Sequence, residues 1–214
     1  MARELAGKRE IKQERAGRTR VLIARAAAEV FAEYGFAGAS VTKITERAGL
    51  TLGALYFHFE NKEALAREIV RGQPERVTPA RESQGLQRAV DISLTWAHQL
   101  LEDPYLLAGA RLVMEQDSFA DPDGNSHQQW TTVFAESLTE AQRLREVRAS
   151  IDVENVARLI VHACTGAQMQ TYLENGRQDL PLRVGEMWSV LLPAIGTPSA
   201  LRRIRVDDPR EVMA

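Results

Sequence analysis

The sequence of 214 residues has one cysteine (Cys164), few aromatic residues (6%) and no long apolar run. A single cysteine excludes a disulfide within the chain and a zinc finger built on cysteines, and it is typical of a reducing compartment. No stretch of about 18 apolar residues occurs, and charges are spread through the first 20 residues, so we predict neither a membrane span nor a secretion signal. We therefore expect a cytoplasmic protein with no membrane partner.

Signatures of catalysis and of metal binding are missing as well. The chain has no HExxH, GxSxG or phosphate-loop motif. An EF-hand loop starting at Asp121 would need glycine and glutamate where the chain has Ser126 and Thr132. The four histidines are far apart, without acidic residues at triad-like or ligand spacing: His58, His98, His127 and His162. We expect no enzyme activity, no cofactor and no metal site.

Strand-like alternation is also absent, whereas helix-forming residues such as alanine, leucine, glutamate and arginine are abundant. Apolar residues recur at helical spacing, for example at Leu22, Ala26, Val30, Phe31 and Tyr34. We predict an all-α fold with a polar loop over 117–126. The longer helices are expected over 18–34, 86–101, 104–115, 127–147, 152–174 and 181–195, with a short piece near 199–204.

The net charge of −2 hides a segregation of charge along the chain. Residues 1–25 carry eight basic and three acidic side chains. Residues 1–73 sum to +4, and residues 74–214 sum to −6. A basic N-terminal arm is typical of a segment that binds phosphates, although a solvated terminus would have the same composition.

Two short helices joined by a glycine turn follow the first helix. Ser40 is a candidate N-cap for a helix over 41–48, and Gly49 follows as its stop. Thr51 is the candidate cap of a second helix over 52–59, and Asn61 that of a third, which runs toward Gly72. This is the helix-turn-helix arrangement, in which the second short helix enters the major groove of DNA.

The run TLGALYFHF from Thr51 to Phe59, followed by Asn61-Lys62-Glu63, resembles the signature of TetR-type transcriptional repressors. The resemblance covers residues 17–72, and the alternative is an aromatic-rich core helix. It implies a basic arm over 1–17, a helix-turn-helix DNA-binding domain over 18–72, and a ligand-binding and dimerisation domain over 73–214.

Within this motif, Gly53 and Ala54 keep the start of the recognition helix slim enough to approach the groove, while Tyr56 and His58 can reach phosphates or base edges. We expect Phe57 and Phe59 to pack beneath. The family commonly has lysine where this chain has Leu52, which could touch a thymine methyl or face solvent. The remaining candidates for DNA contact flank these residues: Ser40, Val41, Thr42, Lys43, Thr51 and Lys62.

Three further segments resemble the γ-butyrolactone receptor subgroup of this family. They are Asp103-Pro104 with Gly109-Ala110-Arg111-Leu112, Trp130-Thr131-Thr132, and Thr165-Gly166-Ala167-Gln168. The resemblance implies that Trp130 forms a wall of the ligand pocket and that Thr165 hydrogen-bonds the signal. Thr131, Gln168, Trp96 and Arg67 are further candidates for the ligand site.

The same residues also admit plainer interpretations. Trp130 could be ordinary core packing, and Thr165 could bond its own i−4 carbonyl. We interpret Cys164 as a buried structural thiol, because it has no adjacent base or resolving cysteine.

We therefore expect a homodimeric repressor that leaves a pseudo-palindromic operator in double-stranded DNA when a small hydrophobic signal, a γ-butyrolactone or a related butenolide or furan, binds. Apolar stripes at Val156, Leu159 and Ile160 and at Met187, Val190 and Leu191 are expected to form the dimer interface. Two alternatives remain open. One is a TetR-type repressor of a multidrug efflux gene with promiscuous ligands, and the other is a helical module that binds a small molecule or a protein without regulating DNA.

Overall fold

The computed structural model describes residues 2–115, 117, 119, 126–208 and 210, with side chains from Gln13 onward. Among these residues the regular elements are all helices, and an isolated bridge joins Val147 to Gly196. The predicted all-α class is confirmed. The chain forms two compact units: residues 1–73 with 104–122, and residues 74–103 with 123–214.

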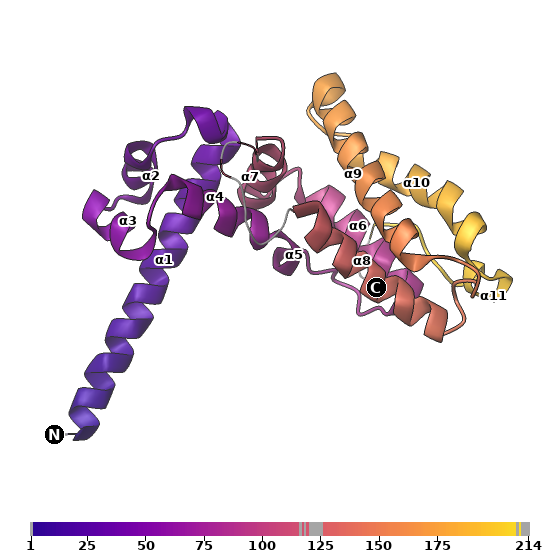
Figure 1. Cartoon of the computed structure of the whole chain (residues 1–214), viewed down its shortest axis with the longest axis horizontal. Coiled ribbons are helices and arrows are strands. Elements are labelled where there is room, and N and C mark those ends of the chain that lie inside the picture. The colour runs from indigo at the N-terminus through magenta and orange to yellow at the C-terminus, as the bar shows by residue number, and fades with distance from the viewer. Residues whose placement is uncertain (1, 116, 118, 120–125, 209, 211–214) are drawn as a thin grey trace. The chain divides into compact units, whose positions relative to one another are not determined.

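The first unit is organised around its N-terminal helix (Figure 1). This helix, α1, packs against the four other helices of the unit. They are α2 (Val41–Ala48), α3 (Leu52–His58), α4 (Lys62–Arg71) and α7 (Pro104–Val113), with α1 itself spanning Ala2–Gly38. Phe31, Ile44, Leu55, Leu65 and Leu112 are fully buried in the shared core. Each such side chain stabilises the fold by about 1.5–3 kcal/mol.

A kink at Gly35 lets α7 close this core. Gly35 has φ 70° and ψ −178°, a conformation that is essentially restricted to glycine. The Arg111 guanidinium of α7 donates to the carbonyl oxygens of Ala32 and Glu33, at 3.1 and 3.0 Å. The Glu115 carboxylate accepts from the backbone N–H of Phe36 at 3.0 Å. The backbone groups that the kink releases on both sides are thus satisfied by α7.

The second unit is a four-helix arrangement. In it α6 packs against α8 and α10, and α9 packs against the same two helices. The bounds are α6 (Gly85–Gln99), α8 (Ser126–Arg143), α9 (Val153–Asn175) and α10 (Leu180–Ile195), accompanied by the short helices α5 (Gln73–Arg76) and α11 (Pro198–Leu201). Trp188 of α10 is fully buried, and its indole N–H donates to Ser93 Oγ of α6 at 2.7 Å.

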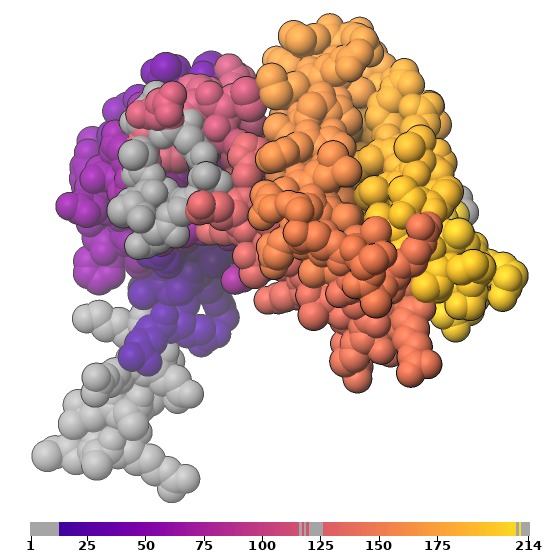
Figure 2. Space-filling model, turned by 45° about the vertical axis from the view of Figure 1, so that its right-hand side comes forward, coloured from indigo at the N-terminus to yellow at the C-terminus, as the bar shows by residue number. Residues whose placement is uncertain are grey.

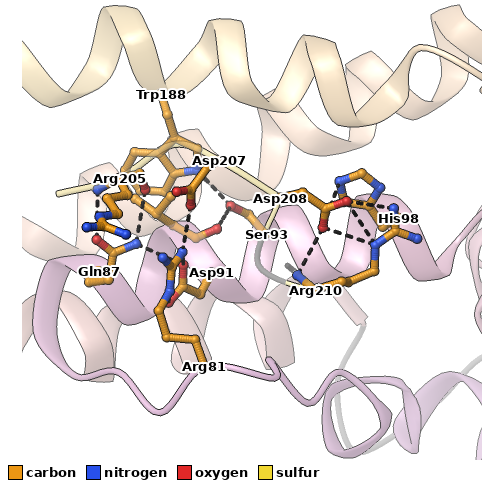
Figure 3. A network of polar contacts seen from close by, with 11 residues as sticks. Arg81, Gln87, Asp91, Ser93, His98, Trp188, Arg205, Asp207, Asp208 and Arg210 are labelled. Carbon is orange, nitrogen blue, oxygen red and sulfur yellow. Dashed lines mark hydrogen bonds and ion pairs between the residues drawn. The ribbon is translucent and has the colours of Figure 1, made fainter. Parts of the chain in front are cut away.

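A polar network holds the C-terminal segment against α6 (Figure 3). Asp91 is fully buried and accepts from Arg81 at 2.6 Å, and the same Arg81 nitrogen lies 3.0 Å from Asp207. Gln87, one turn before Asp91, exchanges two hydrogen bonds with the backbone of Arg205. One face of α6 is therefore fixed by charged and polar contacts, which leaves another face for α8.

Several helix bounds differ from the prediction. α1 begins at Ala2 rather than at Arg18 and continues past Gly35, and Leu22 and Tyr34 are exposed although they follow the helical spacing. α8 ends at Arg143 rather than at Val147, because Arg145 takes a positive φ of 57°. The short α5 was not expected. Most of the expected polar loop over 117–126 lies outside the described residues.

The kink gives a stability prediction. Replacing Gly35 with alanine should lower the free energy of unfolding by about 1–3 kcal/mol through backbone strain alone. The new Cβ would also lie 2.6 Å from a Glu115 carboxylate oxygen. The matched control is Gly17→Ala in the exposed part of α1, where nothing lies within 4 Å. It should stabilise by about 0.5–1 kcal/mol. Urea denaturation at one protein concentration measures both, and equal effects would contradict the account.

Candidate nucleic-acid interface and ligand site

The turn between α2 and α3 is built by local capping. Ser40 Oγ accepts from Lys43 N at 3.2 Å at the start of α2, and Thr51 Oγ1 accepts from Ala54 N at 3.2 Å at the start of α3. Between them, Gly49 ends α2 in the left-handed conformation, with φ 64°. The structure therefore forms the expected helix-turn-helix, and the hydroxyls of Ser40 and Thr51 are engaged in its caps.

Arg20 of α1 fixes the far end of α3. Its guanidinium donates to the carbonyl oxygen of His58 at 3.0 Å, lies 4.4 Å from the ring centroid of Phe59, and pairs with Glu68 of α4. Leu55 of α3 is fully buried in the core of the unit. The inner side of α3 is thus anchored to α1 and α4, and its orientation is set by the core.

The outer side of α3 carries large exposed side chains. Leu52 is 45% exposed, Tyr56 52% and Phe57 76%. The prediction that Phe57 packs beneath α3 is wrong, whereas Phe59 is buried as expected. Because Leu55 and Phe59 are separated by four residues and share the inner face, Phe57 must point away from it. The i, i+4 spacing was therefore the signal that identifies Phe57 as a surface residue.

The predicted DNA residues of α2 and α4 differ in their surroundings. Thr42 and Lys43 are exposed, whereas Val41 packs against the core of the first unit. Lys43 Nζ donates to the Gly38 carbonyl at 2.8 Å. Lys62 is half-buried, and its Nζ donates to the carbonyls of Phe36 and Ala39 at 2.8 and 3.1 Å. Both ammonium groups thus stabilise the end of α1, which the sequence did not indicate.

In the second unit, helix register brings the two candidate tryptophans to one level. A Cβ on Gly85 of α6 would lie 3.4 Å from the Cα of Ala141 in α8, and Leu86 N donates to Glu146 Oε2, so the helices run antiparallel. Trp96 and Trp130 lie the same number of residues from this contact along the two helices, a distance of about three turns. Both therefore lie on the α6–α8 seam, where Trp130 is buried and Trp96 half-buried.

Three buried polar atoms lie within about one turn of these tryptophans along the two helices. Thr95 Oγ1 and Gln99 Oε1 of α6 and Gln129 Oε1 of α8 are buried without a hydrogen-bond partner among the described residues. Buried polar groups of folded proteins are nearly always paired, so such atoms need a reason. A small ligand with polar groups at this level would supply one.

Thr165 of α9 makes two contacts. Its hydroxyl donates to its own i−4 carbonyl, that of Val161, at 2.9 Å, and its oxygen lies 3.1 Å from His127 Nε2 of α8. Burial lowers the pKa of His127, and the nearby His162 lowers it further. His127 is therefore neutral at pH 7, so one of its ring nitrogens can donate and the other can accept.

The other predicted ligand residues are placed differently. Thr131 Oγ1 donates to the His127 carbonyl at 2.7 Å, and buried Gln168 accepts from Arg177 at 2.9 Å. Arg67 lies on α4 and so belongs to the first unit. Cys164 is buried, which raises the pKa of its thiol to about 12, so its thiolate is not available for redox chemistry at neutral pH.

The described residues contain no group of three or more His, Cys, Asp or Glu side chains that could hold a metal ion. None of the helices described there combines the length and the apolar character that a bilayer crossing requires.

Comparison with known proteins matches both parts of the chain to families. Residues 23–69 match the family described as bacterial regulatory proteins, tetR family, and residues 83–196 match the tetracyclin repressor-like C-terminal domain. The chain is 37% identical over 194 residues to the A-factor receptor protein of Streptomyces griseus, covering 91% of this chain and 70% of that protein.

Solved structures agree with these matches. TylP, described as a TetR regulator from Streptomyces fradiae, superimposes with a TM-score of 0.83 at 35% identity, covering 92% of this chain and 95% of that one. A γ-butyrolactone receptor described as ArpA-like superimposes with a TM-score of 0.66 at 28% identity, covering 88% of this chain and 93% of that one.

The opposite placement of the two phenylalanines gives a prediction. Phe59→Ala should lower the free energy of unfolding by about 3–5 kcal/mol, because it empties a buried site beneath Arg20. Phe57→Ala should change it by no more than about 0.5 kcal/mol, because the ring is mostly in water. Denaturant titration of the two variants measures the difference. A large loss of unfolding free energy for Phe57→Ala would contradict the placement of the Phe57 ring at the surface.

Proposed function

The chain belongs to the TetR family of bacterial regulatory proteins, and from that premise we propose that it is a homodimeric repressor that leaves operator DNA when a small hydrophobic signal binds. The observation that carries the proposal is the pairing of two features in one chain. One unit holds a capped helix-turn-helix with an outward-facing α3, and the other holds a seam with two tryptophans and buried polar atoms. We propose residues 1–17 as the basic arm, residues 18–72 as the DNA-binding region and residues 73–214 as the sensing region, within which α7 packs in the first unit.

For the DNA contact, we propose that α3 enters the major groove, with Leu52, Gly53, Ala54, Tyr56 and His58 toward the bases and backbone. Phe57 joins this set because of its exposure. In a dimer, two such helices about 34 Å apart would meet successive turns of the duplex, so the operator would be a pseudo-palindrome.

For the dimer, the exposed apolar residues of α9 and α10 support a shared interface. Figure 2 shows these helices side by side at the surface of the second unit. Leu173 of α9 is 81% exposed and Val190 of α10 is 76% exposed. Of the stripes predicted from the sequence, Leu159 and Val190 face outward, whereas Ile160 and Leu191 are buried in the unit's own core. Burial of the outward residues against a second copy would remove a large apolar surface from water.

Two observations support a γ-butyrolactone as the signal. They are the names of the relatives and the side chains of the α6–α8 seam. One relative is an A-factor receptor and one structure is a γ-butyrolactone receptor. Trp130, with Phe134 at 6.3 Å between ring centroids, offers an aromatic wall. Neutral His127 and the hydroxyls of Thr95 and Thr165 can hydrogen-bond the carbonyl and hydroxyl groups of a butyrolactone, as a small polar set in an apolar pocket should.

For the coupling of the two events, the chain path through α7 supports a direct route. α6, which carries Trp96 and Gln99, is extended by backbone hydrogen bonds as far as Asp103, and α7 begins at the next residue, Pro104. α7 then holds the kink of α1 through Arg111 and Glu115. A ligand that shifts α6 would thus move the helix that closes the DNA-binding core.

A mobility-shift assay on the DNA upstream of the gene tests the function. We expect a retarded complex without ligand, and its release by a γ-butyrolactone at concentrations where unrelated hydrophobic drugs have no effect. Release by many unrelated compounds would favour the efflux-type repressor. No complex with this DNA, or with a duplex selected from a random library, would favour a binding module that does not regulate DNA.

The ligand wall gives a variant prediction. Trp130→Ala should abolish release by the lactone while operator affinity stays within about 2-fold, because the substitution removes the wall and Trp130 belongs to the second unit rather than to the helix-turn-helix. The same mobility-shift assay measures both. Loss of operator binding together with lactone response would mean that Trp130 is a core residue.

A matched pair of threonines controls this test. Thr171 makes the same i−4 backbone bond as Thr165, at 2.9 Å to Ala167, but among the described residues it forms no hydrogen bond with His127. Thr165→Val should weaken the lactone response by about 3- to 10-fold, the size of one hydrogen bond. Thr171→Val should leave that response unchanged, and equal effects would remove Thr165 from the ligand site.

A further inference from the structure

The recognition helix α3 presents an apolar surface. Its sequence, LGALYFH, contains neither lysine nor arginine. The nearest candidate lysines, Lys43 and Lys62, direct their ammonium groups to carbonyl oxygens at the end of α1. The side chains that project from α3 are therefore mainly apolar or aromatic. Charged groups of this helix do not explain how it would recognise a particular DNA sequence.

Leu52 stands at the position of α3 that is best placed to meet a base. It is the first residue of the helix, 45% exposed, and in this motif the N-terminal residues of the recognition helix contact base edges. Its neighbour Gly53 has only Thr51 Oγ1 nearby, 3.9 Å from where a Cβ would lie. The helix surface beside Leu52 therefore carries no bulky side chain at Gly53, and a base edge can approach the leucine side chain.

The chemistry of the major groove then selects one partner. Thymine presents a methyl group there, whereas guanine and adenine present acceptors and a donor, and cytosine has only a hydrogen on C5 beside its N4 donor. A leucine against one of those polar edges would remove it from water without returning a hydrogen bond, which is unfavourable. Against a methyl group, the same leucine loses nothing and buries apolar area.

We propose that Leu52 reads the 5-methyl group of a thymine in each half-site of the operator. The inference rests on the proposed function, because it requires α3 to enter the major groove. It goes beyond that function by assigning an A·T pair to one position of each half-site and by naming the side chain that specifies it.

The test uses DNA that differs only in methyl groups. The full-length protein first selects its operator from a random duplex library, and each symmetric pair of thymines is then replaced by deoxyuridine. At one pair we expect affinity to fall by about 15-fold, from about 4-fold per lost methyl contact in each of two half-sites. At other pairs the change should be small. Equal affinity for every uridine operator would overturn the inference.

Variants assign the effect to Leu52. Leu52→Ala should bring the thymine-to-uridine affinity ratio at that pair close to 1. Leu52→Lys should do the same and make the salt dependence steeper by about one ion per half-site. The control is Met114→Ala, an apolar residue just after α7 that is 54% exposed, which should keep the wild-type ratio. A ratio that survives in both Leu52 variants would assign the methyl to another residue and overturn the proposal.

These outcomes separate the inference from the function on which it rests. If the wild-type protein selects no operator at all, the proposed function fails. If it selects one and ignores thymine methyl groups, the function stands and only the role of Leu52 fails.

Discussion

The kink at Gly35 is the constraint on which the first unit depends. There the backbone takes a conformation open essentially to glycine, and Arg111 and Glu115 satisfy the groups on either side of it. Those two residues lie in and just after α7, a helix that follows α6 in the chain. The core that orients α3 is therefore completed by a segment inserted between two helices of the sensing unit. This arrangement gives a physical reason for one chain to combine DNA binding with ligand binding.

Local features of this structure were predictable from the sequence, because they depend on neighbouring residues. The bounds of α2, the caps at Ser40, Thr51 and Asn61, and the glycine turn at Gly49 each follow from residue preferences over a few positions. The kink was not predictable in the same way. Gly35 reads as a helix stop, and only the contact with residues almost 80 positions later shows why the helix bends and continues.

The candidate site residues show the same difference between local features and contacts with distant residues. The exposure of Tyr56 and the burial of Trp130 agree with roles proposed from the sequence, although both roles remain proposals. Lys62 has the charge expected of a phosphate contact, but its surroundings show a lysine that binds carbonyl oxygens at the end of α1. A lone histidine carries little information in a sequence. His127 becomes a candidate for ligand binding only because Thr165 of another helix lies beside it in the structure. Contacts between distant helices were thus the part that the sequence could not supply.

In the route proposed here, the ligand acts on the DNA-binding unit through α7. The most direct measurement is hydrogen exchange at the amides of Phe36 and Ala37, both of which donate to the Glu115 carboxylate, with and without a γ-butyrolactone. If α7 carries the signal, a lactone that releases the operator changes the protection of these two amides while the amides of the α2 interior keep theirs. A lactone that releases the operator and leaves the protection of Phe36 and Ala37 unchanged would contradict the account.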